Sequence, residues 1–201
     1  MKSYTVKRQI RDQINWSLIP IIEIESWIEK PQLPVQATAQ LCWSDTHLHV
    51  YMTAREPDIL ARYQDDWSPV CRDSCLEMFF CPIAEDSRYF NIELNPNGAC
   101  FFGFGHGRED LIRLHPWNVR ELLNIRTMVD GDFWSVQYDV PEKTLQMFFP
   151  SFTFESGHRM RANFYKCGDD IQPTHELIWN PITNGNSDFH QPAFFGDLIL
   201  E

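Results

Sequence analysis

The chain has 201 residues, of which 43% are hydrophobic and 14% aromatic, and its formal net charge is −11 at pH 7. The negative charge argues against a nucleic-acid partner, because such binding draws most of its affinity from Lys and Arg that neutralise phosphates. No segment approaches the roughly 20 consecutive apolar residues that span a bilayer, so we expect no membrane partner either. The sequence does not indicate an oligomeric state.

Domain organisation follows from the length and the lack of a linker. No repeat, low-complexity tract or Gly/Ser linker divides the sequence, and its length suits one β domain with a substantial core. We expect a single domain over residues 1–201. Residues 1–20 carry charges such as Lys7, Arg8 and Asp12 in place of the apolar stretch of a secretory signal. The chain as written is therefore expected to be cytoplasmic, and secreted if a leader was removed.

Short alternating segments closed by turn residues dominate the chain, and this pattern is typical of strands. In 46–54, for example, Leu48, Val50 and Met52 alternate with more polar residues, which indicates one buried face. In chain order, we expect strands at 36–43, 46–54, 75–81, 88–95, 99–104, 122–129, 132–140, 159–166 and 193–200.

Two turns and one helix complete the pattern. The Asn-Pro-Asn-Gly sequence at 95–98 and the Asp-Gly sequence at 130–131 each supply a tight hairpin turn, since Gly accepts a positive φ. Residues 141–149 predict a short helix, because Pro141 suits a first turn and apolar residues follow at helical spacing. Many antiparallel strands with one or two short helices indicate an all-β fold, an antiparallel, jelly-roll-like β-sandwich.

Polar side chains share one face of three expected strands. Period-two geometry makes these side chains project together if the three strands lie in one sheet. They are Glu77 from 75–81, Tyr89, Asn91, Glu93 and Asn95 from 88–95, and Arg159, Arg161, Asn163 and Tyr165 from 159–166. Planar groups with paired donors and acceptors suit the adjacent hydroxyls of a sugar ring. The face therefore predicts carbohydrate binding.

Tryptophan rings offer the flat apolar surface that suits the C–H face of a sugar. Trp67 lies in a loop-like stretch before 75–81, and Trp179 follows 159–166. We expect either ring to border the site, with packing inside the protein as the alternative for each. The other tryptophans are assigned to packing: Trp16, Trp27, Trp43, Trp117 and Trp134.

The order of several motifs resembles that of the family 9 carbohydrate-binding modules. These motifs are RDSCLEMFF at 72–80, YFNIELN at 89–95 followed by Gly98, RANFYK at 161–166, and FFGDL at 194–198. The resemblance covers the chain from about Trp43 to the C-terminus. It implies a β-sandwich that holds a terminal sugar between two aromatic rings, in support of polysaccharide or glycan catabolism. It also implies ligand contacts from Glu77, Arg108, Arg161 and Trp179, with Trp67 as the second ring.

Together, the polar face and the resemblance predict a non-catalytic site for a mono- or oligosaccharide. Its predicted ligand-binding residues are Trp67, Glu77, Asn91, Glu93, Arg108, Arg161, Asn163 and Trp179. Residues 186–192 are expected to shape a loop over this site. We expect weak equilibrium binding. Stacked rings and water-mediated hydrogen bonds leave only a modest favourable binding free energy once the entropy lost on ordering the ligand and side chains is subtracted.

Glycoside hydrolysis is the alternative function. It needs two carboxyl groups roughly 5 to 9.5 Å apart, and Glu77 and Glu93 on neighbouring strands can satisfy that requirement. A hydroxyl-binding site uses the same residues as acceptors, so we expect no catalytic residue, and an O-glycosyl hydrolase if the protein is an enzyme.

A protein-interaction sandwich is a further alternative, since exposed rings also bind partners. The Gly-rich segment 103–107 lacks the Lys-Ser/Thr pair of a phosphate-binding loop.

No motif with specific metal-ligand spacing is present, and we expect no cofactor. A structural calcium ion is one alternative, because acidic loops contain Asp65, Asp66, Asp169 and Asp170. A transition-metal site is another, formed by His47, His49, His175 and His190. The six cysteines are irregularly spaced, and we interpret them as reduced thiols. Cys71 and Cys75 do not have the spacing of a zinc knuckle.

Overall fold

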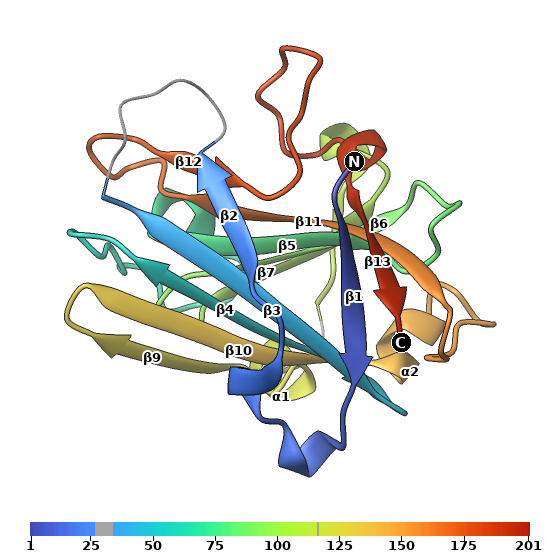
Figure 1. The fold of residues 1–201 in the computed structure, drawn as a ribbon. Helices are drawn as coiled ribbons and strands as arrows, with labels where there is room; N and C mark the ends of the chain where they lie inside the picture. The colour runs from blue at the N-terminus through green and yellow to red at the C-terminus, as the bar shows by residue number, and fades with distance from the viewer. Residues whose placement is uncertain (27–33, 116) are drawn as a thin grey trace.

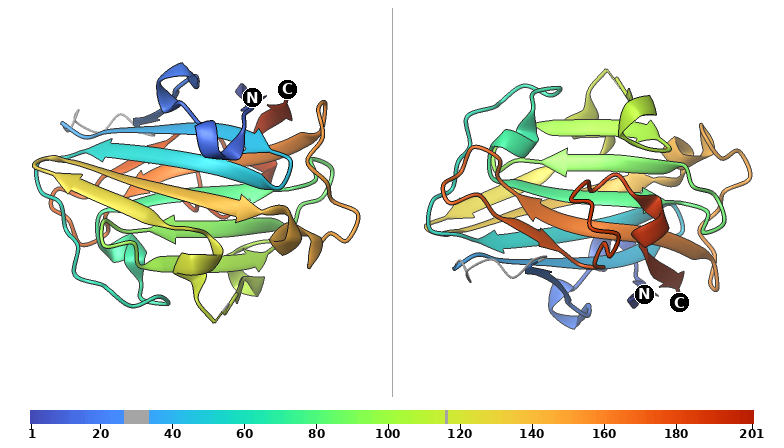
Figure 2. Two further views of the ribbon diagram at one scale, coloured as in Figure 1. Left: turned by 90° about the horizontal axis from the view of Figure 1, so that it is seen from below. Right: turned by 90° about the horizontal axis from the view of Figure 1, so that it is seen from above.

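In the computed structural model, the described residues, 1–26, 34–115 and 117–201, form two facing layers of β-strands (Figures 1 and 2). The first layer contains β5 (Cys75–Cys81), β6 (Tyr89–Leu94), β7 (Cys100–Gly105), β8 (Ile112–Arg113), β11 (Arg159–Cys167), β12 (Glu176–Ile178) and β13 (Gly196–Leu200). The second contains β2 (Ile22–Ser26), β3 (Gln36–Ser44), β4 (His47–Arg55), β9 (Arg126–Asp130) and β10 (Phe133–Pro141).

The pairing of the strands links the two layers at one side. The first layer runs β8-β7-β6-β5-β11, and the second runs β2-β3-β4-β10-β9. β12 pairs with both β11 and β2, while β1 (Ser3–Arg8) pairs with both β13 and β3. The pairs are antiparallel, except that β1 runs parallel to its two neighbours. The predicted antiparallel β-sandwich is therefore confirmed, with β1 as a parallel addition.

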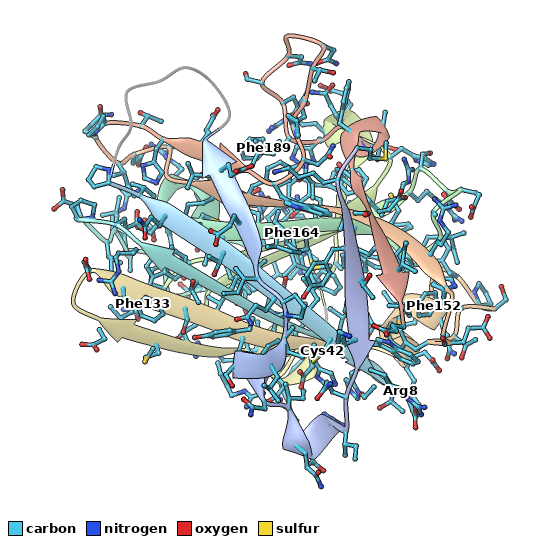
Figure 3. The ribbon with its side chains drawn as sticks, viewed as in Figure 1. Arg8, Cys42, Phe133, Phe152, Phe164 and Phe189 are labelled. Atoms are coloured by element: carbon cyan, nitrogen blue, oxygen red, sulfur yellow. The ribbon has the colours of Figure 1, made fainter. Side chains whose placement is uncertain are left out.

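The hydrophobic core lies between the layers and is built from alternate residues of each strand. On β5, Leu76, Met78 and Phe80 are buried in this core, as the alternation of side chains along a strand requires. Figure 3 places Phe164 of β11 between the layers, whereas Phe189 lies on the outer side of the first layer. The outer side of β5 and β11 is therefore available for a site.

Each predicted strand segment contains a strand, and both predicted turns have the expected conformation, with φ of 77° at Gly98 and 61° at Gly131. The segments predicted at 122–129 and 193–200 begin later than predicted, because Leu122 is the last residue of a short α-helix and residues 192–194 form a 3-10 turn. Strands β1, β2, β8 and β12 were not predicted. These strands are short or bury few side chains; on β2, for example, only Ile22 and Ile24 are buried apolar residues.

The described chain contains two short α-helices, α1 (Val119–Leu122) and α2 (Glu142–Gln146). The predicted helix at 141–149 is present but shorter: Pro141 is the last residue of β10 and directly precedes α2, which ends at Gln146. Neither helix in the described ranges approaches the length and hydropathy of a membrane span. The 3-10 turns are η1 (Arg11–Gln13), η2 (Trp16–Leu18), η3 (Val70–Arg72), η4 (Arg108–Asp110) and η5 (Pro192–Phe194).

The tryptophans assigned to packing have different environments. Trp43 and Trp134 are buried in the core, and Trp16 packs against Tyr51 with ring centroids 5.4 Å apart. Trp117 is fully exposed, so its assignment to packing is wrong; it lies in the turn before α1, where no strand alternation directs it inward. Trp27 lies outside the described residues.

Candidate functional site

Strands β5, β6 and β11 carry the predicted polar face, and they are neighbours in the order β6-β5-β11. Glu77 on β5 lies opposite Glu93 on β6 and opposite Tyr165 on β11. Because side chains alternate along each strand, all three project from the outer side of the first layer. The three strands therefore share one face, as the sequence predicts.

A pocket of about 120 Å³ opens on this face, and the buried Glu77 and Glu93 line it. Arg108 enters from η4, while Phe189 and His190 enter from the connection between β12 and β13. The other lining residues are Cys71, Cys167, Asp169, Glu176 and Ser187. Three of the eight predicted site residues therefore meet in one pocket.

Glu77 and Glu93 are carboxyl groups with little exposure, 3% and 8%. Asn91 Nδ2 donates a hydrogen bond of 2.9 Å to Glu93 Oε1, and the Cys167 thiol donates one of 2.9 Å to Glu77 Oε1. Burial raises the pKa of both carboxyls, and the charge of Glu93 raises the pKa of Glu77 further. The pair therefore retains protons where an exposed glutamate is ionised, so the pocket can donate as well as accept hydrogen bonds.

Arg108 forms an ion pair with the loop that borders the pocket. Its Nε and Nη2 atoms donate to Asp188 Oδ1 at 3.1 and 2.8 Å. The same carboxylate oxygen accepts a hydrogen bond of 3.2 Å from the backbone N–H of His190. This arrangement brings the only cation among the described pocket-lining residues close to the two glutamates.

Phe189 and His190 are the aromatic rings that line the pocket. The Phe189 ring stacks on Tyr165, with centroids 4.1 Å apart and an interplanar angle of 10°. His190 Nδ1 and the Tyr89 hydroxyl are joined by a hydrogen bond of 2.6 Å. Three residues of the segment 186–192 line the pocket: Ser187, Phe189 and His190. The two rings were not predicted as pocket residues, because an irregular loop has no periodicity that assigns its side chains to a face.

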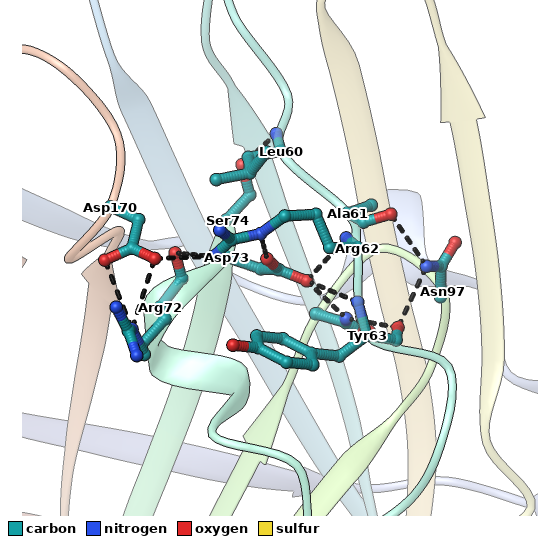
Figure 4. A network of polar contacts seen from close by, with 10 residues as sticks. Leu60, Ala61, Arg62, Tyr63, Arg72, Asp73, Ser74, Asn97 and Asp170 are labelled. Carbon is teal, nitrogen blue, oxygen red and sulfur yellow. Dashed lines mark hydrogen bonds and ion pairs between the residues drawn. The ribbon is translucent and has the colours of Figure 1, made fainter.

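A second polar network fixes the segment that leads into β5 (Figure 4). The buried Asp73 accepts hydrogen bonds through Oδ2 from the backbone N–H groups of Arg62 and Tyr63, at 2.8 and 3.0 Å, and from Asn95 Nδ2 at 3.0 Å. Arg62 Nη2 also donates to Asp170 Oδ2 at 2.7 Å. The network therefore ties the start of β5 to the end of β6 and to the segment after β11, which are the elements that form the pocket.

Arg161 and Asn163 share the outer face but lie outside the pocket. Arg161 pairs with Cys81, four residues along β11 from Tyr165, so it is about 13 Å from the level of Glu77. It donates instead to the Pro192 carbonyl at 3.1 Å. The fully buried Asn163 exchanges hydrogen bonds of 2.9 Å with the backbone of Asn180. The structure gives these two residues positioning contacts with the following loops.

Trp179 lies in the hydrophobic core, with 5% of its surface exposed. Its ring packs against Phe164, and it fills the space beside Gly196 so closely that an added Cβ there would lie 2.7 Å from the indole. A buried ring cannot stack on a sugar, so the predicted role of Trp179 is wrong for this arrangement. The segment after β11 forms β12, and Trp179 directly follows it with its ring in the core. The local sequence pattern does not indicate this strand.

Trp67 lies at a different pocket from the two glutamates. Its ring contacts His115, and it lines a small cavity with Phe101 and Arg113. Arg113 also donates to the Trp67 carbonyl at 2.9 Å. The two predicted indoles therefore do not enclose the pocket, and Phe189 and His190 are the rings found there.

The aspartates considered for calcium do not converge. Asp170 pairs with Arg62 and Arg72, and Asp66 accepts a hydrogen bond from the backbone of Cys100. Of the four histidines considered for a transition metal, His47 and His49 stack on each other, while His175 and His190 lie elsewhere. His49 lies between Ser44 and Asp139 on the second layer, whereas His190 lies at the pocket.

One group within the described ranges does place three potential metal ligands together. It consists of Cys75, Glu77 and Cys167, whose ligand atoms all lie within 4.8 Å of one another. Cys75 and Cys167 are far apart in the sequence, and the pairing of β5 with β11 sets them opposite each other. The spacing of these residues along the sequence therefore does not predict the group.

Comparisons with known proteins identify similar sequences and folds. The sequence model of carbohydrate-binding family 9 matches residues 6–200. A proposed carbohydrate-binding protein from Bacteroides uniformis aligns over 100% of this chain and 99% of its own, with 24% identity and a TM-score of 0.85. A family 9 module from Caldicellulosiruptor kristjanssonii in complex with cellotriose aligns over 100% of this chain and 94% of its own, with 16% identity and a TM-score of 0.69. The same module in complex with glucose has the same identity and TM-score and is covered over 96% of its length. No curated protein sequence gives a match.

Proposed function

Because this chain belongs to carbohydrate-binding family 9, we propose that it binds a mono- or oligosaccharide without catalysis, in the pocket formed by Glu77, Glu93 and Arg108. The observation that carries the proposal is the convergence of these three groups with two aromatic rings on the outer face of the first layer. Carboxyls and a guanidinium supply the acceptors and donors that neighbouring sugar hydroxyls need.

The pocket favours a single sugar unit. Its volume of about 120 Å³ is below the roughly 300–1,000 Å³ of pockets that enclose drug-sized ligands. One ring, or the terminal ring of a longer chain, would therefore be held, with the remainder outside. The glucose and cellotriose complexes of the related module support this choice of ligand class.

Each pocket group has a distinct part in the proposed recognition. Glu93 and Glu77 accept hydrogen bonds from sugar hydroxyls when ionised and donate one when protonated. Arg108 donates, and its bond to Asp188 holds the bordering loop in place. Phe189 and His190 supply the apolar surface for the C–H groups of the ring. The rings predicted for this purpose, Trp67 and Trp179, lie elsewhere.

A glycan array followed by calorimetry tests the proposal, with glucose and cellotriose as the first soluble probes. Arg108→Ala should weaken the affinity by about tenfold or more, because a charged hydrogen bond contributes about 1.5–3 kcal/mol. Arg159→Ala is the matched control, since this arginine lies on the same strand face but outside the pocket, where it pairs with Asp197, and should leave the affinity within about twofold. Glu93→Gln provides a second pocket variant. No sugar bound on the array, or equal losses in Arg108→Ala and Arg159→Ala, would overturn the proposal.

Hydrolysis receives no support from the comparisons, since the family that matches is a binding family. Aryl glycosides should therefore persist when they are incubated with the purified protein. Turnover that disappears in Glu77→Gln would contradict a purely binding role.

We also propose that the protein works in a reducing compartment, the cytoplasm. All six cysteines are free thiols, and Cys75 and Cys167 face each other across β5 and β11 without a disulfide. Disulfides form readily in oxidising compartments and are rare in the cytosol. Acid quenching of cells, followed by alkylation under denaturing conditions with a chelator and by mass spectrometry, should label all six cysteines, because unfolding exposes the buried thiols. A Cys75–Cys167 disulfide in the native host would contradict the assignment.

A further inference from the structure

Two potential metal ligands with suitable chemistry, Glu77 and Cys167, line the pocket, and a third, Cys75, lies beside them. Cys75 and Glu77 project from the same side of β5, two residues apart, and Cys167 projects beside them from β11. The Cys167 thiol already donates to Glu77 Oε1 at 2.9 Å. The three side chains come from two adjacent strands of a packed sheet, so their positions are set by the fold rather than by a loop.

The spacing of these atoms is close to that of a tetrahedral metal centre. The three ligand atoms lie within 4.8 Å of one another. Bonds of about 2.3 Å to sulfur and 2.0 Å to oxygen place the ligand atoms of a tetrahedral zinc ion roughly 3.5–3.8 Å apart. Rotamer adjustments of at most about 1 Å would therefore complete the geometry. Two thiolates favour zinc over magnesium or calcium, which prefer oxygen ligands alone.

The charge of the surroundings also favours a cation. The carboxyl groups of Glu77, Glu93, Asp169 and Glu176 line the pocket, and Arg108 is the only cationic side chain among the described lining residues. A buried carboxyl is costly to ionise without a partner. A bound divalent ion would compensate the charges of the thiolates and of Glu77 together.

We propose that Cys75, Glu77 and Cys167 form a binding site for a thiophilic divalent cation such as Zn²⁺. The two thiols, and Glu77 when it is protonated, release their protons to solvent when the ion binds. Glu77 and Cys167 line the pocket, so the fourth coordination position faces it and can take a water molecule or a hydroxyl of a ligand. Three protein ligands with one open position make this an accessible site rather than a closed structural one.

This site goes beyond the proposed carbohydrate binding and does not depend on it, because the metal can be titrated without any sugar. Cobalt(II) is the spectroscopic probe: the full chain, reduced and freed of metal, is titrated with Co²⁺. We expect one equivalent to bind, with a thiolate-to-cobalt charge-transfer band that one equivalent of Zn²⁺ then abolishes. A titration without a thiolate band would overturn the proposal.

Variants identify the ligands. Cys75→Ser and Cys167→Ser should each lower the Zn²⁺ affinity by about 100-fold or more, since loss of even an outer-shell partner costs 10–100-fold. Cys42→Ser is the matched control, because Cys42 is also a buried free thiol but lies on β3 of the second layer, and should change the affinity by less than about twofold. Equal effects in all three variants would contradict the assignment.

The wild-type protein provides a test that does not require the variants to fold. X-ray absorption at the zinc edge should show two sulfur neighbours at about 2.3 Å. Glu77→Gln, which keeps both thiols, should retain the sulfur signal and bind the ion more weakly. Coordination by oxygen and nitrogen alone would overturn the proposal, whatever the result of the sugar experiments.

Discussion

At the scale of single residues, the chemistry of the pocket depends on two carboxyl groups that have little contact with solvent. Burial makes their ionised forms costly. Asn91 and Arg108 offset part of this cost at Glu93. The pocket therefore combines groups that can change protonation with an arginine that stays charged.

Glu93→Gln should stabilise the protein at pH 8 and have little effect near pH 4. Burial raises the pKa of Glu93 from 4.5 to about 7, so between these values the folded state holds a proton that the unfolded state releases. Wild-type stability therefore falls as pH rises through this window. Replacing the Glu93 carboxyl should raise the free energy of unfolding by roughly 1–3 kcal/mol at pH values above this window. Urea unfolding of both proteins at pH 4, 6 and 8 measures the difference, and a difference independent of pH would contradict the argument.

The sequence predicted some of the site residues and not others for a geometric reason. Glu77 and Glu93 could be assigned because period-two alternation fixes the face on which a strand residue lies. The alternation does not fix the position along the strand at which a pocket forms, so Arg161 was expected in the site although it lies further along β11. Phe189 and the pairing of Cys75 with Cys167 depend on long-range register, which a single sequence does not specify.

At the scale of elements, the loops determine where on the first layer the pocket lies. The network around Asp73 joins the segment before β5 to the end of β6. The Arg108–Asp188 pair joins η4 to the loop after β12. The strands were predicted well because each carries its own alternation and closing turn. The short β8 and β12 form because their neighbours supply hydrogen-bonding partners, and their own sequences contain little signal.

Asp73→Ala should destabilise the protein by about 3–5 kcal/mol, because removing one partner of a buried charged network leaves the other polar groups unpaired. The variant should also loosen the segment that carries Cys71. Asp170→Ala is the control, since Asp170 binds Arg62 at the surface, and should leave the free energy of unfolding nearly unchanged. Denaturant unfolding of the two variants compares their free energies of unfolding. Equal losses of stability would show that the burial of Asp73 does not account for its contribution.

At the scale of the whole molecule, one buried ion pair joins the two layers. Lys166 Nζ of β11 lies 3.0 Å from Glu56 Oε2, which directly follows β4, and both side chains are almost completely buried. Trp134 of β10 donates to the other oxygen of Glu56 at 2.6 Å. The contact with Oε2 is a charge contact rather than an aligned hydrogen bond. A cation and its partner therefore connect the two layers, in addition to the apolar core and the strand pairings of β12 and β1.

Glu56→Gln should cost about 3–5 kcal/mol, because it leaves the Lys166 charge buried without its anion. The double variant Glu56→Gln/Lys166→Met should recover much of this loss, since an apolar chain of similar volume replaces the charge. A double-mutant cycle based on urea unfolding measures the coupling. Additive losses in the double variant would show that the two groups do not interact energetically.

The two ends of the described chain meet in the parallel pair of β1 and β13, which lie side by side and point the same way (Figure 1). Parallel strands place the N-terminus at one end of the ladder and the C-terminus at the other. Tension applied between the termini would slide the two strands along each other and load all their bridging hydrogen bonds at once. Antiparallel terminal strands would instead open one bond at a time. The fold is therefore arranged to resist mechanical extension, because rupture must shear the whole ladder in a single step.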